Sequence, residues 1–287
     1  MNGENLRKIH FFKMTGTGND FIMIDNRNGV LDSDHCQDLV RHACRHKLSV
    51  GADGVILIEN DPEVDFKWRF FNADASEAEM CGNGARCAAR FAYLTGIVNK
   101  SQVSFRTLAG IIRAELLGNR VKVRMTPPHG LRLDLSLDAE GRSFQLDFIN
   151  TGVPHTICFT ADENELESID VARWGRVLRF HPHFQPAGTN VNFVWVRDRR
   201  HIVVRTYERG VEGETLACGT GAIASTLICA ARDRVDSPVA VTTRSGESLT
   251  IHFETVRGTK PALEFSEVCL EGEARVVYEA DLWPETI

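Results

Sequence analysis

The alternation of apolar and polar residues along the chain predicts a protein built mainly from short strands. Residues 21–24 (FIMI) and 55–58 (VILI) are apolar runs between polar neighbours, a pattern typical of short buried strands. Residues 68–71 (WRFF) form a third such run and lead into the polar stretch NADASEAEMCGNG. Further strands are predicted at residues 105–107, 111–117, 121–125, 156–159, 191–196, 202–207, 239–243 and 249–253.

Three segments have the pattern of helices. Residues 33–47 (SDHCQDLVRHACRHK) predict an amphipathic helix that Ser33 or Asp32 caps. Residues 85–94 (ARCAARFAYL) and 222–231 (AIASTLICAA) are apolar on nearly every face. Because a helix without a polar side is enclosed by its surroundings, we expect each of these two helices to lie inside a curled mixed sheet.

The two halves of the chain repeat the same order of elements. The frame Cys-Gly-x-Gly-Ala occurs at Cys81 and again at Cys218, each time at the start of an apolar helix. Gly18 precedes Cys81 by 63 residues, and Gly152 precedes Cys218 by 66. A frame that recurs in register indicates a duplicated unit of domain size.

These patterns together predict an α+β fold of two pseudo-symmetric domains. Each domain is expected to be a curled mixed β-sheet around a central apolar helix, with an active site in the cleft between the domains. The N-terminal half is placed at residues 1–126, with residues 272–287 returning to it, and the C-terminal half at residues 127–271. Pro127 and Pro128 punctuate the chain at this boundary.

Composition narrows the class of protein. The 287 residues are 43% hydrophobic and 25% charged, as in soluble globular proteins of one large or two ordinary domains. The net charge of -6 gives no reason to expect nucleic acid or a membrane as a partner. No apolar run approaches the length of a membrane span, and the N-terminus MNGENLRKIHFFKM lacks a secretory signal pattern, so a cytoplasmic protein is expected.

The eight cysteines do not have the density of a disulfide-rich secreted domain, and thiols are expected in a reducing compartment. Six of them are expected to pack as small buried hydrophobes. These six are Cys36, Cys44, Cys87, Cys158, Cys229 and Cys269.

A histidine and cysteine cluster in residues 35–46 invites a metal interpretation. It lacks the paired cysteines of the usual structural zinc site. His42 and His46 are one helical turn apart, but no adjacent glutamate completes a hydrolytic motif. A solvated helix face is therefore the prediction, with no metal bound.

The two Cys-Gly-x-Gly turns supply the candidate chemistry. A helix N-terminus presents unpaired N–H groups and a positive dipole end, which attract anions and lower the pKa of a cysteine thiol. Two such turns facing each other across a cleft would suit inversion at a proton-bearing carbon: one thiolate removes the proton, and the opposite thiol returns one. No lysine motif for pyridoxal phosphate is evident, so no cofactor is expected and N–H dipoles must stabilise the carbanion.

Several segments together resemble the diaminopimelate epimerase family. The likeness runs from about residue 12 to about residue 272. The segments are KMTGTGNDF (13–21), FNAD (71–74), MCGNGARC (80–87), GTNVNF (188–193), YERG (207–210) and ETLACGTGA (214–222).

The resemblance implies an isomerase that interconverts LL- and meso-diaminopimelate without a cofactor, in lysine and peptidoglycan biosynthesis. It implies that Cys81 and Cys218 are the acid–base pair, that His155 and Glu208 are auxiliary acid–base groups beside the thiols, and that the protein is a homodimer. The residues that match substrate-binding positions are Asn19, Asn72, Gly82, Asn83, Asn190, Glu208, Arg209, Gly219 and Thr220.

The chain departs from the family pattern at three positions. Val153 stands where the family often has an asparagine, Gly54 where some members have a glutamine, and Ala75 where many have a glycine. Val153 and Gly54 bear mainly on recognition of the non-reacting end of the substrate. A cofactor-free epimerase or racemase of the same fold acting on another amino acid therefore remains an alternative.

Two alternatives come from other classes of protein. A thiol redox or metal-binding protein would use Cys81 and Cys218 as a pair without epimerising anything. A non-catalytic amino-acid-binding module would bind its ligand without solvent exchange at the α-carbon.

Overall fold

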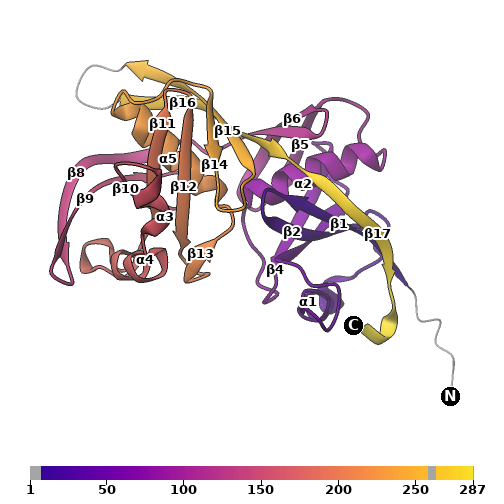
Figure 1. Cartoon of the computed structure of the whole chain (residues 1–287). Coiled ribbons are helices and arrows are strands. Elements are labelled where there is room, and N and C mark those ends of the chain that lie inside the picture. Colours follow the sequence, from indigo (N-terminus) through magenta and orange to yellow (C-terminus); the bar gives the residue numbers. More distant parts are fainter. Residues whose placement is uncertain (1–7, 258–262, 287) are drawn as a thin grey trace. The chain divides into compact units, whose positions relative to one another are not determined.

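The computed structural model describes residues 8–257 and 263–286 (Figure 1). Contacts within the chain divide it into two compact units. Unit 1 takes the chain up to Val123 and from Gly272 onward, and unit 2 is Arg124–Glu271. Each unit has its own set of successively paired strands and its own central helix.

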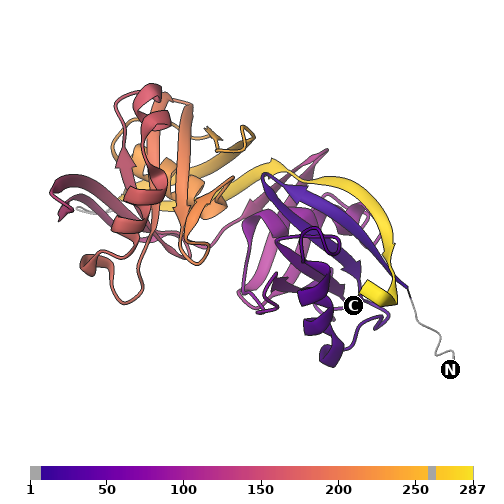
Figure 2. The ribbon, with the colours of Figure 1, turned by 60° about the horizontal axis from the view of Figure 1, so that its bottom comes forward.

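The sheet of unit 1 is mixed. Strands β2–β3 and β4–β5 pair in parallel, and β17–β1, β1–β2, β3–β4, β5–β6 and β6–β7 pair antiparallel. Helix α2 packs against β1, β2, β3 and β6, while α1 packs against β4 (Figures 1 and 2). The bounds are β1 Ile9–Gly16, β2 Asn19–Asp25, α1 Ser33–Ala43, β3 Gly54–Glu59, β4 Phe66–Asn72, α2 Gly82–Leu94, β5 Gln102–Thr107, β6 Gly110–Leu117, β7 Arg120–Arg124 and β17 Arg275–Leu282.

The sheet of unit 2 is also mixed. Strands β10–β11 and β12–β14 pair in parallel, and β8–β9, β9–β10, β11–β12, β12–β13, β14–β15 and β15–β16 pair antiparallel. Helix α5 packs against six of these strands. The bounds are β8 His129–Ala139, β9 Arg142–Asn150, β10 Pro154–Phe159, α3 Glu163–Ser168, α4 Val171–Arg179, β11 Asn190–Asp198, β12 His201–Glu208, β13 Gly213–Thr215, α5 Gly219–Ala231, β14 Val239–Thr242, β15 Ser248–Arg257 and β16 Leu263–Glu273.

The order of pairings confirms the predicted duplication. Starting from β1 in unit 1 and from β9 in unit 2, successive pairings run antiparallel, parallel, antiparallel, parallel, antiparallel. In each unit the second parallel connection passes through the apolar helix, α2 or α5. The predicted α+β fold, with a mixed sheet around a central helix in each half, is therefore what the structure has.

Strand β3 shows why these sequences form sheets that are buried on both sides. Val55 and Leu57 belong to a core that also contains Leu39 and Val40 of α1. The side chain between them, Ile56, lies on the other face, where its Cδ1 is close to α2 at Gly84. Successive side chains of a strand point to opposite faces, so an unbroken apolar run places apolar side chains in the cores on both faces of the sheet.

Helix α1 is shorter than predicted. It begins at Ser33, and Asp32 accepts a hydrogen bond from the N–H of His35, so Asp32 is the capping residue of the two proposed. It ends at Ala43, whose carbonyl accepts from the N–H of Gly51, while Ala52 donates to the carbonyl of Cys44. The returning loop thus takes over the carbonyls that a continued helix would use, and the prediction of helix to residue 47 was wrong.

Sequence patterns missed several elements. The β8–β9 hairpin alternates half-buried and exposed residues along β8, so it has no apolar run to find. Helices α3 and α4 are short. Strand β17, which pairs with β1, was not predicted as a strand, although it lies in residues 272–287, the segment that the sequence analysis placed with the N-terminal half.

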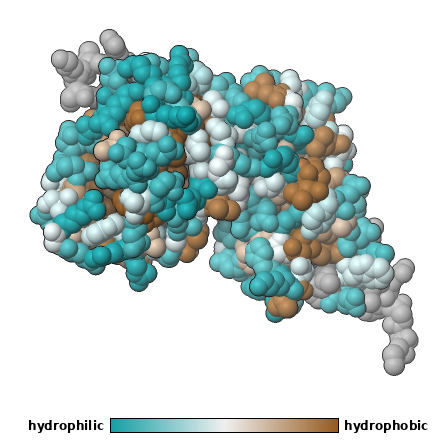
Figure 3. Space-filling model, viewed as in Figure 1, coloured by the Kyte–Doolittle hydropathy of each residue, from teal (hydrophilic) through white to brown (hydrophobic). Residues whose placement is uncertain are grey.

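The exposure of the cysteine and histidine side chains can be compared with the predictions made for them. Five of the six cysteines expected in the core are buried, but Cys269 on β16 is partly exposed. His42 and His46 are exposed, as a solvated face requires. Hydrophilic side chains cover most of the visible face in Figure 3, with scattered hydrophobic patches. Among the described residues, no helix is both long and apolar enough to span a membrane.

Candidate active site

Cys81 is the N-cap residue of α2. Its backbone is extended, with φ -142° and ψ 118°, and its Sγ accepts a hydrogen bond of 3.4 Å from the N–H of Gly84. Gly82 and Asn83 open the helix, and the thiol is half-buried. The sulfur therefore lies at the end of α2 where the positive dipole end and the unpaired N–H groups favour negative charge.

A polar network joins the start of α2 to the turn between β1 and β2. The buried Asn83 donates from Nδ2 to Asn19 Oδ1 over 2.6 Å, and Asn19 Nδ2 donates to Asp53 Oδ2 over 2.8 Å. Asp53 also accepts from the N–H of Asp20, whose carboxylate pairs with Lys13 at 2.6 Å. Two predicted substrate-binding asparagines are thus in direct contact, and carboxylates support them.

Asn72 and Gly54 lie opposite each other on β4 and β3. Asn72 is exposed, and its Nδ2 donates to Ser76 Oγ in a tight turn. At Gly54, an added Cβ would lie 2.4 Å from the carbonyl oxygen of Phe71. The backbone of β4 therefore leaves no room for a side chain at the position where some family members have a glutamine.

Cys218 is the N-cap residue of α5, in the position that Cys81 has on α2. Its backbone is also extended, with φ -127° and ψ 109°, and the residue is 7% exposed. Its Sγ lies 3.5 Å from the hydroxyl of Thr220, whose carbonyl oxygen accepts from the hydroxyl of Thr151. Gly219 and Thr220 open the helix, so their N–H groups are among the unpaired donors of its first turn.

Asn190 ties the predicted substrate-binding residues of unit 2 together. Its Oδ1 accepts from the N–H of Arg209 over 2.8 Å, and its Nδ2 donates to the carbonyl of Pro154 over 3.0 Å. The Arg209 guanidinium donates to the carbonyl of Ala187. Glu208 ends β12 beside Arg209 and is half-buried. The structure thus brings Asn190, Glu208 and Arg209 together at the ends of β11 and β12.

His155 is fully buried at the start of β10. Burial lowers the pKa of its imidazole to about 3, and the positive charge of Arg209 adds to this. The ring is therefore neutral at neutral pH. Val153 lies half-buried just before this strand.

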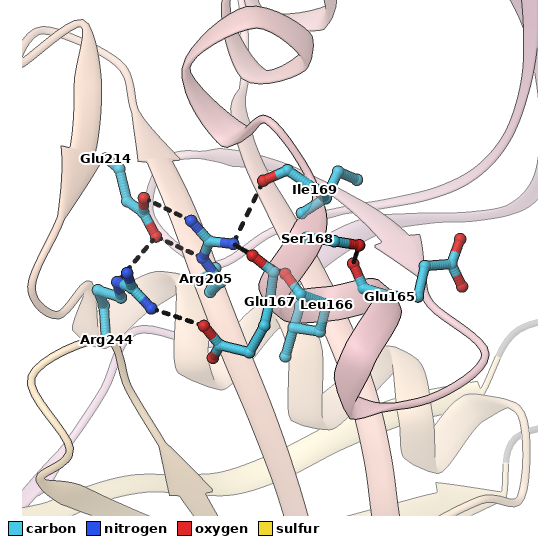
Figure 4. Close-up of polar contacts among 8 residues, drawn as sticks. All are labelled: Glu165, Leu166, Glu167, Ser168, Ile169, Arg205, Glu214 and Arg244. Atoms are coloured by element: carbon cyan, nitrogen blue, oxygen red, sulfur yellow. Dashed lines mark hydrogen bonds and ion pairs between the residues drawn. The ribbon is translucent and has the colours of Figure 1, made fainter.

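An ion-pair cluster anchors the segment that leads to Cys218 (Figure 4). Arg205 on β12 donates from Nε and Nη2 to the two carboxylate oxygens of Glu214, at 2.7 and 2.8 Å. Its Nη1 donates to the carbonyls of Leu166, Glu167 and Ile169, at the end of α3. Because Glu214 lies four residues before Cys218, this cluster fixes the approach to the turn that carries Cys218.

Sequence reasoning missed three residues that support the site: Asp53, Asn192 and Arg205. Asn192 and Arg205 carried a usable signal, since each is a polar residue inside an apolar strand run that the structure buries. Such a residue must find a polar partner, which the sequence leaves unnamed.

The family model for diaminopimelate epimerase matches residues 11–130 and 148–261 of this chain. The chain belongs to the diaminopimelate epimerase family. The family's curated members include the diaminopimelate epimerase of Aquifex aeolicus, 48% identical over 97% of this chain and 99% of that protein. The diaminopimelate epimerase of a Hydrogenobaculum species is 45% identical over 94% of this chain and 97% of that protein.

Solved structures share the fold of this diaminopimelate epimerase family member at low sequence identity. A phenazine biosynthesis protein of the PhzF family from Bacillus anthracis matches with a TM-score of 0.74 at 15% identity, covering 96% of this chain and 99% of that one. A hydroxyproline epimerase from Agrobacterium vitis matches with a TM-score of 0.70 at 16% identity, covering 99% and 94%. At these identities the likeness concerns the fold.

Proposed function

We propose that this protein epimerises LL-diaminopimelate to meso-diaminopimelate without a cofactor, using Cys81 and Cys218 as its two acid–base groups. Membership of the diaminopimelate epimerase family supports the reaction and makes the protein an isomerase. One structural observation carries the mechanism: the two cysteines occupy the same N-cap position on equivalent helices of a duplicated fold.

Each step of the proposed reaction moves one proton. The thiolate of one cysteine takes the α-proton, so an S–H bond forms and the C–H electron pair stays on the substrate as a carbanion conjugated with its carboxylate. The thiol of the other cysteine gives its proton to the opposite face and becomes a thiolate. The N–H groups of Gly82, Asn83, Gly219 and Thr220 are proposed to hold the carboxylate on which charge develops.

The remaining residues are proposed to bind the rest of the substrate. Arg209 has a planar guanidinium suited to a carboxylate, and exchanging the Ala187 carbonyl for a substrate carboxylate would replace a neutral acceptor by a charged one. Asn19, Asn72, Asn190 and Glu208 supply hydrogen bonds to amino and carboxylate groups. His155 and Glu208 are proposed to act beside the thiols.

The deciding experiment is incubation of the purified protein with LL-diaminopimelate in deuterated water, followed by separation of the isomers. We expect meso product that carries one deuterium at the inverted α-carbon, because the returning proton comes from a solvent-exchanged thiol. Absence of both inversion and exchange, with a folded protein, would refute the proposed function.

The departures at Val153 and Gly54 favour testing one alternative substrate class. Gly54 has no room for a side chain, so the protein lacks a side-chain contact there with the distal end of a ligand. A panel of other amino acids in the same deuterium assay distinguishes the two functions. Faster exchange at a single-centre amino acid than at diaminopimelate would establish the alternative, a racemase of the same fold.

Two further proposals concern assembly and compartment. We propose a homodimer, supported by exposed apolar residues on β17, where Val277 is 58% and Tyr278 is 43% exposed. Light scattering that gives the mass of one chain at all concentrations would contradict it.

We propose the cytoplasm as the compartment, because the eight cysteines of the sequence do not have the density of a disulfide-rich secreted domain and suit a reducing environment.

A further inference from the structure

A fully buried amide lies between two strands of unit 2. Asn192 on β11 is aligned with Ile157 of β10 and with Thr206 of β12. Its Nδ2 lies 3.1 Å from the carbonyl oxygen of Thr156 and 3.1 Å from Nδ1 of His155. Its Oδ1 accepts a hydrogen bond of 3.0 Å from the hydroxyl of Thr206. All three polar contacts of this amide are thus made inside the protein.

The chemistry of these partners fixes the direction of each hydrogen bond. A backbone carbonyl only accepts, so the atom of Asn192 that faces the Thr156 carbonyl must be the NH₂ group. An amide NH₂ only donates, so Nδ1 of His155 must accept from it and carries no proton. Because the ring is neutral, its single proton is on Nε2.

The same amide lies directly beneath the helix turn that carries the second thiol. A Cβ added to Gly221 would be 2.4 Å from Asn192 Oδ1 and 3.3 Å from Cys218 Cβ. Gly221 therefore lets the first turn of α5 rest on the amide. A substitution at Asn192 therefore alters both the hydrogen bond to the His155 imidazole and the packing of the α5 turn that carries Cys218.

The far nitrogen of His155 is a buried donor. Within residues 8–257 and 263–286, Nε2 has no hydrogen-bond partner. Asn190 is the register partner of His155 on β11, and the positive charge of Arg209 acts on the ring. Leaving a buried N–H unpaired is costly, so a site that keeps one is suited to an acceptor that arrives with a ligand.

We propose that Asn192 is a positioning residue that holds His155 in the Nε2–H tautomer, so that the ring offers a hydrogen-bond donor to an anionic group at the Cys218 site. In this arrangement His155 cannot take a proton at Nδ1 without breaking its bond to Asn192. Its proposed role in the reaction is to donate a hydrogen bond from Nε2. The catalytic consequence rests on the proposed function, whereas the tautomer does not.

The test is ¹⁵N NMR of the histidine side chains, with the His155 signals identified by their loss in His155→Gln. For the unmodified protein we expect a pyridine-type Nδ1 and a pyrrole-type Nε2. In Asn192→Asp, an acceptor replaces the donor, and we expect the proton to appear on Nδ1. In the epimerase assay, kcat of Asn192→Asp should fall about 100-fold with KM changed far less, because the substrate-binding residues are intact.

Thr206→Val is the matched control. It removes the bond to Asn192 Oδ1 but leaves both bonds from Nδ2, so His155 should keep its Nε2–H signature. If Asn192→Asp does not fold, the spectrum of the unmodified protein still decides: a proton on Nδ1 overturns the proposal. A tautomer switch with unchanged kcat refutes the catalytic role. An inactive unmodified protein with the Nε2–H signature refutes the proposed function and leaves the tautomer assignment standing.

Discussion

The two cysteine turns share a backbone and differ in what surrounds them. Cys81 and Cys218 are both N-cap residues with extended φ and ψ, and a Gly-x-Gly sequence opens the helix after each. Around Cys81, the network of Asn83 and Asn19 leads to the carboxylate of Asp53, whose backbone N–H donates to the carboxylate of Asp20. Around Cys218, the fully buried His155 is bonded to the neutral amide of Asn192, which Thr206 supports, and the charge that acts on its ring is the cation of Arg209.

This difference shows which features duplication has kept. The approach to each cysteine is held by an arginine on the preceding strand and a glutamate four residues before the thiol: Arg69 with Glu77, and Arg205 with Glu214. The backbone and this anchor are common to both halves, while the polar side chains next to the thiols are not. The two sulfurs are therefore placed alike but meet different electrostatic surroundings, which suits two groups with unlike tasks.

Removing either thiol should have the largest effect. We expect Cys81→Ala and Cys218→Ala each to lower kcat by about 10³-fold, because each cysteine handles the proton on one face only. Cys36→Ala, at a buried cysteine of α1, is the control and should keep its activity. The measurement is the rate of isomer formation with circular dichroism as a check of folding. Full turnover in either site variant would end the two-base scheme.

The two equivalent glycines should differ in their tolerance of a methyl group. Gly221→Ala places a Cβ 2.4 Å from Asn192 Oδ1, and we expect a loss of about 3 kcal/mol in the free energy of unfolding. Gly84→Ala meets the end of the Ile56 side chain at 3.1 Å, and the better helix propensity of alanine offsets that contact, so a change within about 1 kcal/mol is expected. Urea unfolding gives both values, and equal losses would contradict the difference in packing.

Acid should weaken unit 2 through His155. Burial lowers the pKa of this imidazole to about 3 from 6.5, so the unfolded chain binds its proton first as pH falls. The stability that the neutral ring provides is complete above pH 6.5 and is lost as pH falls toward 3. Between pH 7.5 and 5, the unmodified protein should lose about 2 kcal/mol more than His155→Gln. Parallel unfolding curves for the two proteins at both pH values would rule this out.

The smallest expected effect is the difference in stability between substitutions at the two arginine anchors, Arg205 and Arg69. Arg205 binds Glu214 with two nitrogens and also caps α3, whereas Arg69 binds Glu77 through Nε at 3.2 Å. We expect Arg205→Lys to cost about 1 kcal/mol of unfolding free energy and Arg69→Lys about half of that. Arg199→Lys, at an exposed ion pair, is the control with an effect near zero. A larger loss at Arg69 than at Arg205 would reverse the comparison.

Much of the fold could be predicted because its signals are local. Runs such as residues 21–24 and 55–58 are short and apolar, and each became a strand, β2 and β3. Helix α1 was too long in the prediction because the loop that takes over its last carbonyls returns from residues 51 and 52. Such hydrogen bonds depend on the path of the loop that follows the helix. The hydrophobic periodicity of the helix itself carries no information about that path.

The apolar helices and the two cysteines that open them follow from short stretches of consecutive residues, and the duplication follows from comparing two such stretches. Which polar side chains meet depends on the folded chain: Asn83 contacts Asn19, and His155 contacts Asn192. Strand register sets those meetings, and register is fixed by the packing of whole faces rather than by any one residue. The positions of the two N-cap sulfurs are thus local in origin, and their surroundings are products of the fold.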